Sequence, residues 1–314
     1  MKKPKDTRKS RISDFYRNKN GEKMINEILA KISEDRIKEV KIDDTSHFLV
    51  NGNCLEILKT FPDDCIDLII TDPPYNLGLD YGPYFKDKKR KEEYFNECKV
   101  WLKEVARVLN KTGSFYLINY PEANARLLPF IEDELKLKFR RWITWHYPTN
   151  IGHSKKNFTR SQRSILFFTK SNDYTFNREN IIQHYKNPEA KRIRERLENG
   201  YNGRSSYDLL RFLDMIELSK GMIDVLDINL LKNVSKDRFN KKHPCQLPLS
   251  LLRILVKVSS NENDILLDPF AGTFTLSAVA KELHRNSIGI EINPDYVNLG
   301  LDRLMKNERN TIML

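Results

Sequence analysis

Apolar and polar positions along the chain follow two periods, and the period changes from segment to segment. Between residues 22 and 40, apolar side chains recur every three or four positions, which predicts one amphipathic helix. Short apolar runs predict strands at 48–50, 66–70, 114–118, 141–145, 164–169, 265–267 and 287–290. Helical spacing separates them, at 54–58, 93–109, 122–136, 249–258, 275–284 and 295–306. Alternating strands and helices predict an α/β fold with a mostly parallel sheet.

This alternation is interrupted between residues 172 and 242, where polar turns separate helical stretches at 189–198 and 206–217. We therefore divide the chain into four parts. They are an N-terminal extension with the amphipathic helix (1–45), a first half of the α/β domain (46–171), an insertion (172–242) and a second half (243–314). No run approaches the roughly 20 apolar residues of a membrane span, so we expect no membrane association.

Charge is distributed unevenly. The chain has 314 residues and a formal net charge of +11, and residues 151–245 hold 19 basic and 11 acidic side chains, a net charge of +8. Such a block between nearly neutral segments predicts a module that meets a polyanion. The four cysteines are far apart and form no C-x-x-C pair, so we expect no disulfide framework, no metal site and a cytoplasmic location.

One candidate ligand turn reads Asp268-Pro-Phe-Ala-Gly-Thr-Phe-Thr275, between an apolar strand and a helix. Small residues there let a ligand approach the backbone and the helix N-terminus. Glu291 ends the next strand, 19 residues after Gly272, where an acidic residue typically bonds ribose hydroxyls. An ordinary tight turn would explain the first segment alone. The combination favours an adenosine-containing cofactor, and the lack of G-x-G-x-x-G disfavours a dinucleotide.

A second candidate turn, Asp72-Pro73-Pro74-Tyr75, directly follows a buried strand. In open α/β sheets, ligands bind at the carboxyl ends of strands. An exocyclic amino group of adenine or cytosine must become tetrahedral before it can attack a methyl group. The Asp72 carboxylate and the Pro73 carbonyl can each accept one amino N–H, and Tyr75 offers a ring on which the base stacks. A third segment, His243-Pro-Cys-Gln-Leu-Pro248, forms a rigid lead-in to a helix and could equally be a structural cap.

In this order, the three segments resemble the beta class of S-adenosylmethionine-dependent DNA amino-methyltransferases of the DPPY type. The resemblance covers roughly residues 47–300 and implies a Rossmann-like, doubly wound methyltransferase sheet. The sheet would be circularly permuted, with the target-recognition region inserted between its catalytic and cofactor-binding halves. It also implies S-adenosyl-L-methionine as cofactor, with double-stranded DNA as substrate. A homodimer and a cognate restriction endonuclease are further partners that it suggests.

The resemblance implies roles for individual residues. The catalytic ones are Asp72, Pro73, Pro74 and Tyr75. The cofactor-binding ones are Asn53, Cys54, Asp72, Pro244, Gln246, Asp268, Pro269, Phe270, Ala271, Gly272, Thr273, Thr275, Glu291 and Ile292. Candidates for DNA phosphate contacts are Lys155, Lys156, Arg160, Arg163, Lys191, Arg192, Arg194 and Arg196. A loop at 77–91, with five basic residues, is expected to close over DNA.

Two positions depart from the family pattern. Phe274 stands where the family usually has Gly, so its ring either crowds the cofactor or points into the core. Leu247 stands where Lys is common.

The expected activity is site-specific methylation of the adenine 6-amino group in duplex DNA by base flipping, within a restriction-modification system. Methylation of the cytosine 4-amino group, an RNA or protein substrate, and a non-catalytic nucleic-acid-binding protein are the alternatives.

Overall fold

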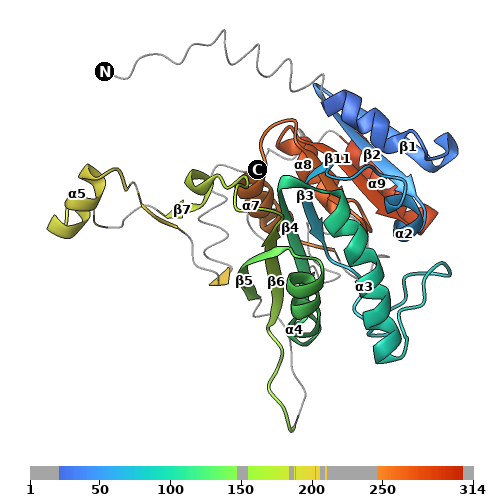
Figure 1. Ribbon diagram of the computed structural model, residues 1–314, viewed down its shortest axis with the longest axis horizontal. Coiled ribbons are helices and arrows are strands. Elements are labelled where there is room, and N and C mark those ends of the chain that lie inside the picture. Colours follow the sequence, from blue (N-terminus) through green and yellow to red (C-terminus); the bar gives the residue numbers. More distant parts are fainter. Residues whose placement is uncertain are drawn as a thin grey trace, which may run out of the picture.

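The protein is described by a computed structural model that covers residues 21–146, 155–183, 187, 189–201, 203–205, 209–210 and 246–306. A nine-stranded sheet in the order β1-β2-β11-β10-β3-β4-β6-β5-β9 forms its centre (Figure 1). Its strands are β1 (Ile37–Ile42), β2 (Thr45–Asn51), β3 (Ile66–Thr71), β4 (Leu109–Asn119), β5 (Lys138–His146), β6 (Gln162–Thr169), β9 (Leu209–Leu210), β10 (Ile265–Asp268) and β11 (Asn286–Glu291). The five strands from β2 to β4 in this order are parallel, and β6 is antiparallel to both of its neighbours.

Helices cover both faces of the sheet. One face packs against α2 (Cys54–Leu58), α3 (Lys91–Val108) and α4 (Pro121–Pro129), which continues into one π-helical turn, η2 (Phe130–Glu134). The other carries α7 (Leu249–Ser259), α8 (Thr275–Glu282) and α9 (Pro294–Met305). In β3, Ile66 and Ile69 face the first layer, whereas Leu68 and Ile70 face the second. This two-sided burial explains why the strand reads as a continuous apolar run, and the expected doubly wound α/β fold is confirmed.

The N-terminal segment differs from the prediction of one helix over 22–40. Residues 21–29 are helical, a 3₁₀ turn follows at Glu34–Arg36 (η1), and β1 pairs with β2 as a hairpin. The turn between them needs a left-handed residue, which Asp43 provides with φ of +51°. β-Branched residues within Ile37–Ile42 favour a strand, and pairing with β2 overrides the helical spacing.

The insertion contains few described elements. They are η3 (Arg178–Ile181), β7 (Ile182–Gln183), α5 (Lys191–Glu198) and β8 (Arg204–Ser205), and β7 pairs with β8. Figure 1 shows α5 at the left, well away from the sheet. The expected helix over 206–217 is wrong at Leu209–Leu210, which form β9 along β5, and its other positions lie outside the described residues. The division into catalytic, target-recognition and cofactor-binding parts, like the circular permutation, stays a prediction.

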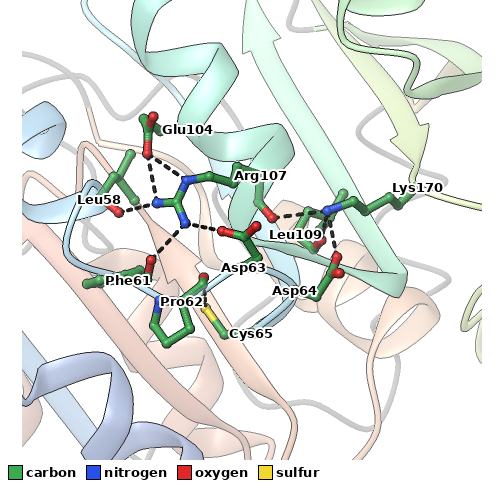
Figure 2. Close-up of polar contacts among 10 residues, drawn as sticks. All are labelled: Leu58, Phe61, Pro62, Asp63, Asp64, Cys65, Glu104, Arg107, Leu109 and Lys170. Atoms are coloured by element: carbon green, nitrogen blue, oxygen red, sulfur yellow. Dashed lines mark hydrogen bonds and ion pairs between the residues drawn. The ribbon is translucent and has the colours of Figure 1, made fainter.

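A polar cluster anchors the segment that leads into β3 (Figure 2). The Arg107 guanidinium, at the end of α3, donates to Glu104 at 2.7 and 2.9 Å and to Asp63 at 2.6 Å. It also donates to the backbone carbonyls of Leu58 and Phe61. Beside it, the Lys170 ammonium donates to the Asp64 carboxylate at 2.6 Å. These charge-assisted bonds tie the lead-in of β3 to α3 and to the residue that follows β6, and so fix where β3 begins.

Candidate active site

The two candidate ligand turns lie side by side because their strands are neighbours. β3 and β10 run parallel, with Leu68 opposite Leu266 and Ile69 opposite Leu267, so both turns emerge at the same edge of the sheet. The Thr71 hydroxyl, at the end of β3, donates to the Asp268 carboxylate at 3.2 Å. Segments almost 200 positions apart therefore meet at the carboxyl ends of the two central strands, where open α/β sheets bind ligands.

A cavity of about 960 Å³, counted with its open mouth, lies between these turns. It brings together all but one of the residues expected at the catalytic and cofactor positions. Those that line it are Asn53, Cys54, Asp72, Pro73, Pro74, Tyr75, Gln246, Asp268, Pro269, Phe270, Ala271, Gly272, Thr273, Thr275, Glu291 and Ile292. The remaining one, Pro244, lies outside the described residues.

Two carboxyl groups stand at the edge of the cavity, Asp268 buried and Glu291 half-buried. Glu291 accepts hydrogen bonds from the backbone N–H groups of Gly272 at 2.8 Å and Asn293 at 2.9 Å. Asp268 accepts from the N–H of Phe270 at 3.1 Å. Burial raises the pKa of each carboxyl to about 7, against the effect of these bonds. Gly272 has φ of +52°, so a side chain there would be strained and would stand beside Glu291.

The turn Asp72–Tyr75 is rigid, and hydrogen bonds hold its polar groups in place. The Tyr75 hydroxyl donates to the Asp72 carboxylate, and the Tyr75 ring lies 4.9 Å from that of Tyr120. From α3, the Tyr94 hydroxyl donates to the Pro74 carbonyl at 3.0 Å. Two consecutive prolines and this bond hold the backbone of the turn in place. The site thus presents a carboxylate and a partly stacked aromatic ring to the cavity.

Phe274 points into the core and away from the cavity. Its side chain is fully buried among Leu49, Val297 and Leu304. With φ of +56°, it occupies the left-handed region that favours glycine, which accounts for the glycine usual at this place in the family. The ring fits because its neighbours on β11 and α9, Gly289 and Gly300, have no side chains. Of the two outcomes expected for this ring, core packing is the observed one.

The comparisons with known proteins agree with this geometry. Residues 66–302 match the family model described as DNA methylase. The chain is 33% identical over 257 residues to the type II methyltransferase M.HpaI of Haemophilus parainfluenzae, covering 82% of this chain and 73% of that protein. It is 34% identical over 266 residues to the DNA adenine methyltransferase YhdJ of Escherichia coli K12, covering 82% of both. The chain belongs to the DNA methylase family.

Solved structures of low sequence identity share the fold of this DNA methylase. The cytosine-N4-specific PvuII DNA methyltransferase has a TM-score of 0.62 and 19% identity, over 83% of this chain and 87% of that one. A complex of M1.HpyAVI with SAM has a TM-score of 0.55 and 21% identity, over 82% and 98% of the two chains. The identified resemblance to amino-methyltransferases of the DPPY type is confirmed.

The cations expected to contact DNA fall into two sets. Seven have exposed positions: Lys155, Lys156, Arg160, Lys191, Arg192, Arg194 and Arg196. Arg160 pairs with Glu122 at 2.6 Å, and its guanidinium lies 4.0 Å from the centre of the Tyr120 ring. Arg163 is different, since it is only 6% exposed and lies within β6. β6 is buried from Arg163 to Thr169, so this side chain does not lie at the surface as the other seven do, and its contact with DNA phosphate stays a prediction.

Sequence reasoning missed part of the cavity wall. Tyr81 and Phe85, from the polar loop at 77–91, line the cavity. Buried Asp87 holds this loop by accepting from the N–H groups of Asn76 at 2.8 Å and of Leu77 and Leu79 at 3.1 Å. The aromatic residues of this Lys-rich stretch, Tyr81, Tyr84 and Phe85, are the signal that could have indicated the role. Closure of this loop over DNA stays a prediction.

No described helix has the length and apolarity that a membrane crossing requires. The amphipathic helix of residues 21–29 packs instead on the sheet, through Ile25 and Ile28, which belong to the main core.

Proposed function

We propose that this DNA methylase transfers a methyl group from S-adenosyl-L-methionine to the 6-amino group of adenine in duplex DNA. The observation that carries the proposal is the single cavity shared by the Asp72–Tyr75 turn and the Asp268–Thr275 turn. One turn has the acceptors that an exocyclic amine requires, and the other has the small-residue entry to a helix that suits an adenosine cofactor. The relative YhdJ is named a DNA adenine methyltransferase, which favours adenine.

The residues present fit the cofactor. Glu291 is a half-buried carboxylate at the end of β11 with acceptor capacity beyond its two backbone bonds, which suits ribose hydroxyls. Phe270 and Ile292 give the cavity apolar walls for an adenine ring. Asp268 and Asp72 add negative charge, which suits the cationic methionine end. When bound, S-adenosyl-L-methionine supplies a methyl group activated by the adjacent sulfonium.

The protein's part in the reaction is to position the base and accept its protons. The target base leaves the helical stack, because its amino group cannot reach the cavity from inside the duplex. The Tyr75 ring stacks on the base, while the Asp72 carboxylate and the Pro73 carbonyl accept the two amino N–H groups. This directs the nitrogen lone pair toward the methyl group, and Asp72 lies within reach of the proton that the nitrogen loses.

The decisive test is Asp72→Ala. We expect this variant to bind S-adenosyl-L-methionine in calorimetry nearly as the wild type does, and to lose methyl transfer to duplex DNA. Gly272→Asp should have the opposite effect and abolish cofactor binding. Its side chain would be strained at φ of +52°, and it would add a carboxylate to a residue whose N–H group bonds Glu291. Near-normal transfer by Asp72→Ala would refute the proposed chemistry.

Cytosine-N4 methylation is the second candidate, favoured by the likeness in fold to the PvuII enzyme. The same two acceptors can orient either amine, so the geometry of Asp72 and Pro73 does not separate them. Mass spectrometry of nucleosides from DNA methylated by the purified protein distinguishes N6-methyladenine from N4-methylcytosine, and sequencing of the same DNA gives the recognition site.

We further propose that the exposed cations of residues 155–160 and of α5 contact DNA phosphates, and that the protein acts in the cytoplasm within a restriction-modification system. Two relatives are named type II methyltransferases, M.HpaI and M1.MboII. Light scattering during gel filtration tests the expected homodimer. Protection of methylated DNA from a co-encoded nuclease tests the expected cognate endonuclease.

A further inference from the structure

Arg163 carries a buried positive charge beside the Asp72–Tyr75 turn. It lies on β6, with its guanidinium carbon 4.9 Å from the ring centre of Tyr75, 5.5 Å from that of Trp145 and 5.7 Å from that of Tyr120. Three aromatic faces thus surround a cation whose side chain is 7% exposed. Such an enclosure fixes the guanidinium in one place.

The same guanidinium meets the catalytic carboxylate. Arg163 Nη1 lies 3.7 Å from Asp72 Oδ2, and the Asp72 side chain is 9% exposed. The other carboxylate oxygen, Oδ1, accepts from the Tyr75 hydroxyl. One oxygen of Asp72 thus faces a cation on β6 at ion-pair distance, and the other accepts a hydrogen bond from the ring that would stack on the base. Arg163 contacts the two side chains that the proposed chemistry uses.

The contact between Arg163 and Asp72 bears on whether the Asp72 carboxyl is ionised. Burial favours the protonated form of a carboxyl, and the carboxyl of Asp268, at the end of β10, repels negative charge on Asp72. A protonated Asp72 could accept fewer hydrogen bonds from an amine and could not take its proton. Among the described residues, groups that act on Asp72 include the Arg163 guanidinium, the Tyr75 hydroxyl and the Asp268 carboxyl. The guanidinium charge and the hydroxyl that donates to Oδ1 both favour the ionised form, and the guanidinium is the one that carries a full positive charge.

We propose that Arg163 is a positioning residue for methyl transfer, which keeps Asp72 ionised and fixes Asp72 and the Tyr75 ring in the orientation that the target amine requires. The inference rests on the proposed function. Arg163 touches neither DNA nor cofactor in this role and reads no sequence. Its loss should therefore slow the chemical step and leave the binding of both ligands nearly unchanged.

The test compares Arg163→Gln, Arg163→Lys and Lys155→Gln in single-turnover methylation of duplex DNA. We expect Arg163→Gln to slow the step about 100-fold, the size of a small misplacement of a reacting group. Its cofactor affinity and DNA affinity should stay within about twofold of the wild type, whereas Lys155→Gln should weaken DNA binding. Arg163→Lys, which keeps the charge without the planar fork, should recover part of the rate.

The pH profile distinguishes positioning from a purely structural role. The acidic limb of the rate should move to higher pH in Arg163→Gln and return in Arg163→Lys. A normal rate with weakened, less salt-dependent DNA binding would make Arg163 a phosphate contact and overturn the inference. If Arg163→Gln does not fold, Arg163→Met, which keeps the length of the side chain without its charge, takes its place, and a normal rate and pH profile in that variant overturn the inference as well. Absence of any transfer by the wild type would instead refute the proposed function.

Discussion

The tight packing of the Phe274 ring against Gly300 leads to a prediction about stability. The effect of Gly300→Ala on the free energy of unfolding should change sign when Phe274 is replaced by alanine. A Cβ atom on Gly300 would lie 2.7 Å from the Phe274 ring carbon Cγ and 3.0 Å from Leu49 Cδ2. The ring has no room to move away, because its other side already packs on the backbone of Gly289. A Cβ built on Gly289 would be only 2.6 Å from two ring carbons. Overpacking of this kind costs about 1–3 kcal/mol, and the separation here is well below van der Waals contact, so we take about 3.

Against this stands the gain of about 1 kcal/mol from replacing glycine by alanine inside a helix. Gly300→Ala should therefore destabilise the protein by about 2 kcal/mol, from the two magnitudes above. Phe274→Ala alone should cost about 3–5 kcal/mol through the cavity that it leaves. In the Phe274→Ala background the added methyl group meets no ring, so Gly300→Ala should stabilise by about 1 kcal/mol. The coupling between the two sites is thus about 3 kcal/mol.

Thermal unfolding followed by circular dichroism measures the cycle, at about 2–4 °C per kcal/mol for a domain of this size. Gly300→Ala should lower the midpoint in the wild type and raise it in Phe274→Ala. Asn298→Ala, at an exposed position on the same helix, is the control and should shift the midpoint equally in both backgrounds. A Gly300→Ala effect of the same sign in both would show that Phe274 does not fill this slot.

Three further predictions follow from charges and loop contacts. Asp268 and Glu291 have pKa values near 7, above their ordinary values, so the folded chain binds more protons than the unfolded chain between about pH 4 and 7. The stability that they contribute is therefore present at low pH and is lost as the pH rises through 7, and Asp268→Asn should flatten the dependence of the unfolding midpoint on pH. Changing both Lys155 and Lys156 to Gln should reduce the slope of log affinity for DNA against log salt by about 2, with the sequence preference unchanged; an unaltered slope would remove them from the interface. Asp87→Asn weakens three backbone bonds and should expose the 77–91 loop to limited proteolysis, while equal cleavage rates would mean that Asp87 does not hold it.

Much of the fold and the cavity could be predicted from the sequence, because strands buried on both faces are continuous apolar runs. β3 and β10 were recognisable for this reason, and each ends in a turn with its own chemistry, at Asp72 and at Asp268. The rule that parallel strands present their carboxyl ends to one site then brings the two turns together. The resemblance supplied residue roles that spacing alone could not.

Other features depend on contacts that no local pattern encodes. The helical spacing at 22–40 continues through β1, whose conformation is decided by pairing with β2. Arg163 looks like a surface cation within a basic block, and only the alternation of β6 turns it toward Asp72. The direction of the Phe274 ring depends on two glycines that follow it by 15 and 26 positions along the chain. In each case the local sequence allows two conformations, and contacts with residues distant in the sequence decide between them.

The order of strands also determines when the site can exist during synthesis. β2 and β3 are consecutive in the chain but are separated in the sheet by β11 and β10, which come from residues 265–291. Roughly 190 residues lie between the end of β3 and the start of β10. At a synthesis rate of about 5–20 residues per second, a ribosome needs about 10–40 s to supply the missing strands. Until then β3, an apolar strand, has an open edge of the kind that pairs with other chains. Supplying a peptide with β10 and β11 to a chain that ends before them would therefore be expected to rescue its solubility by filling that gap.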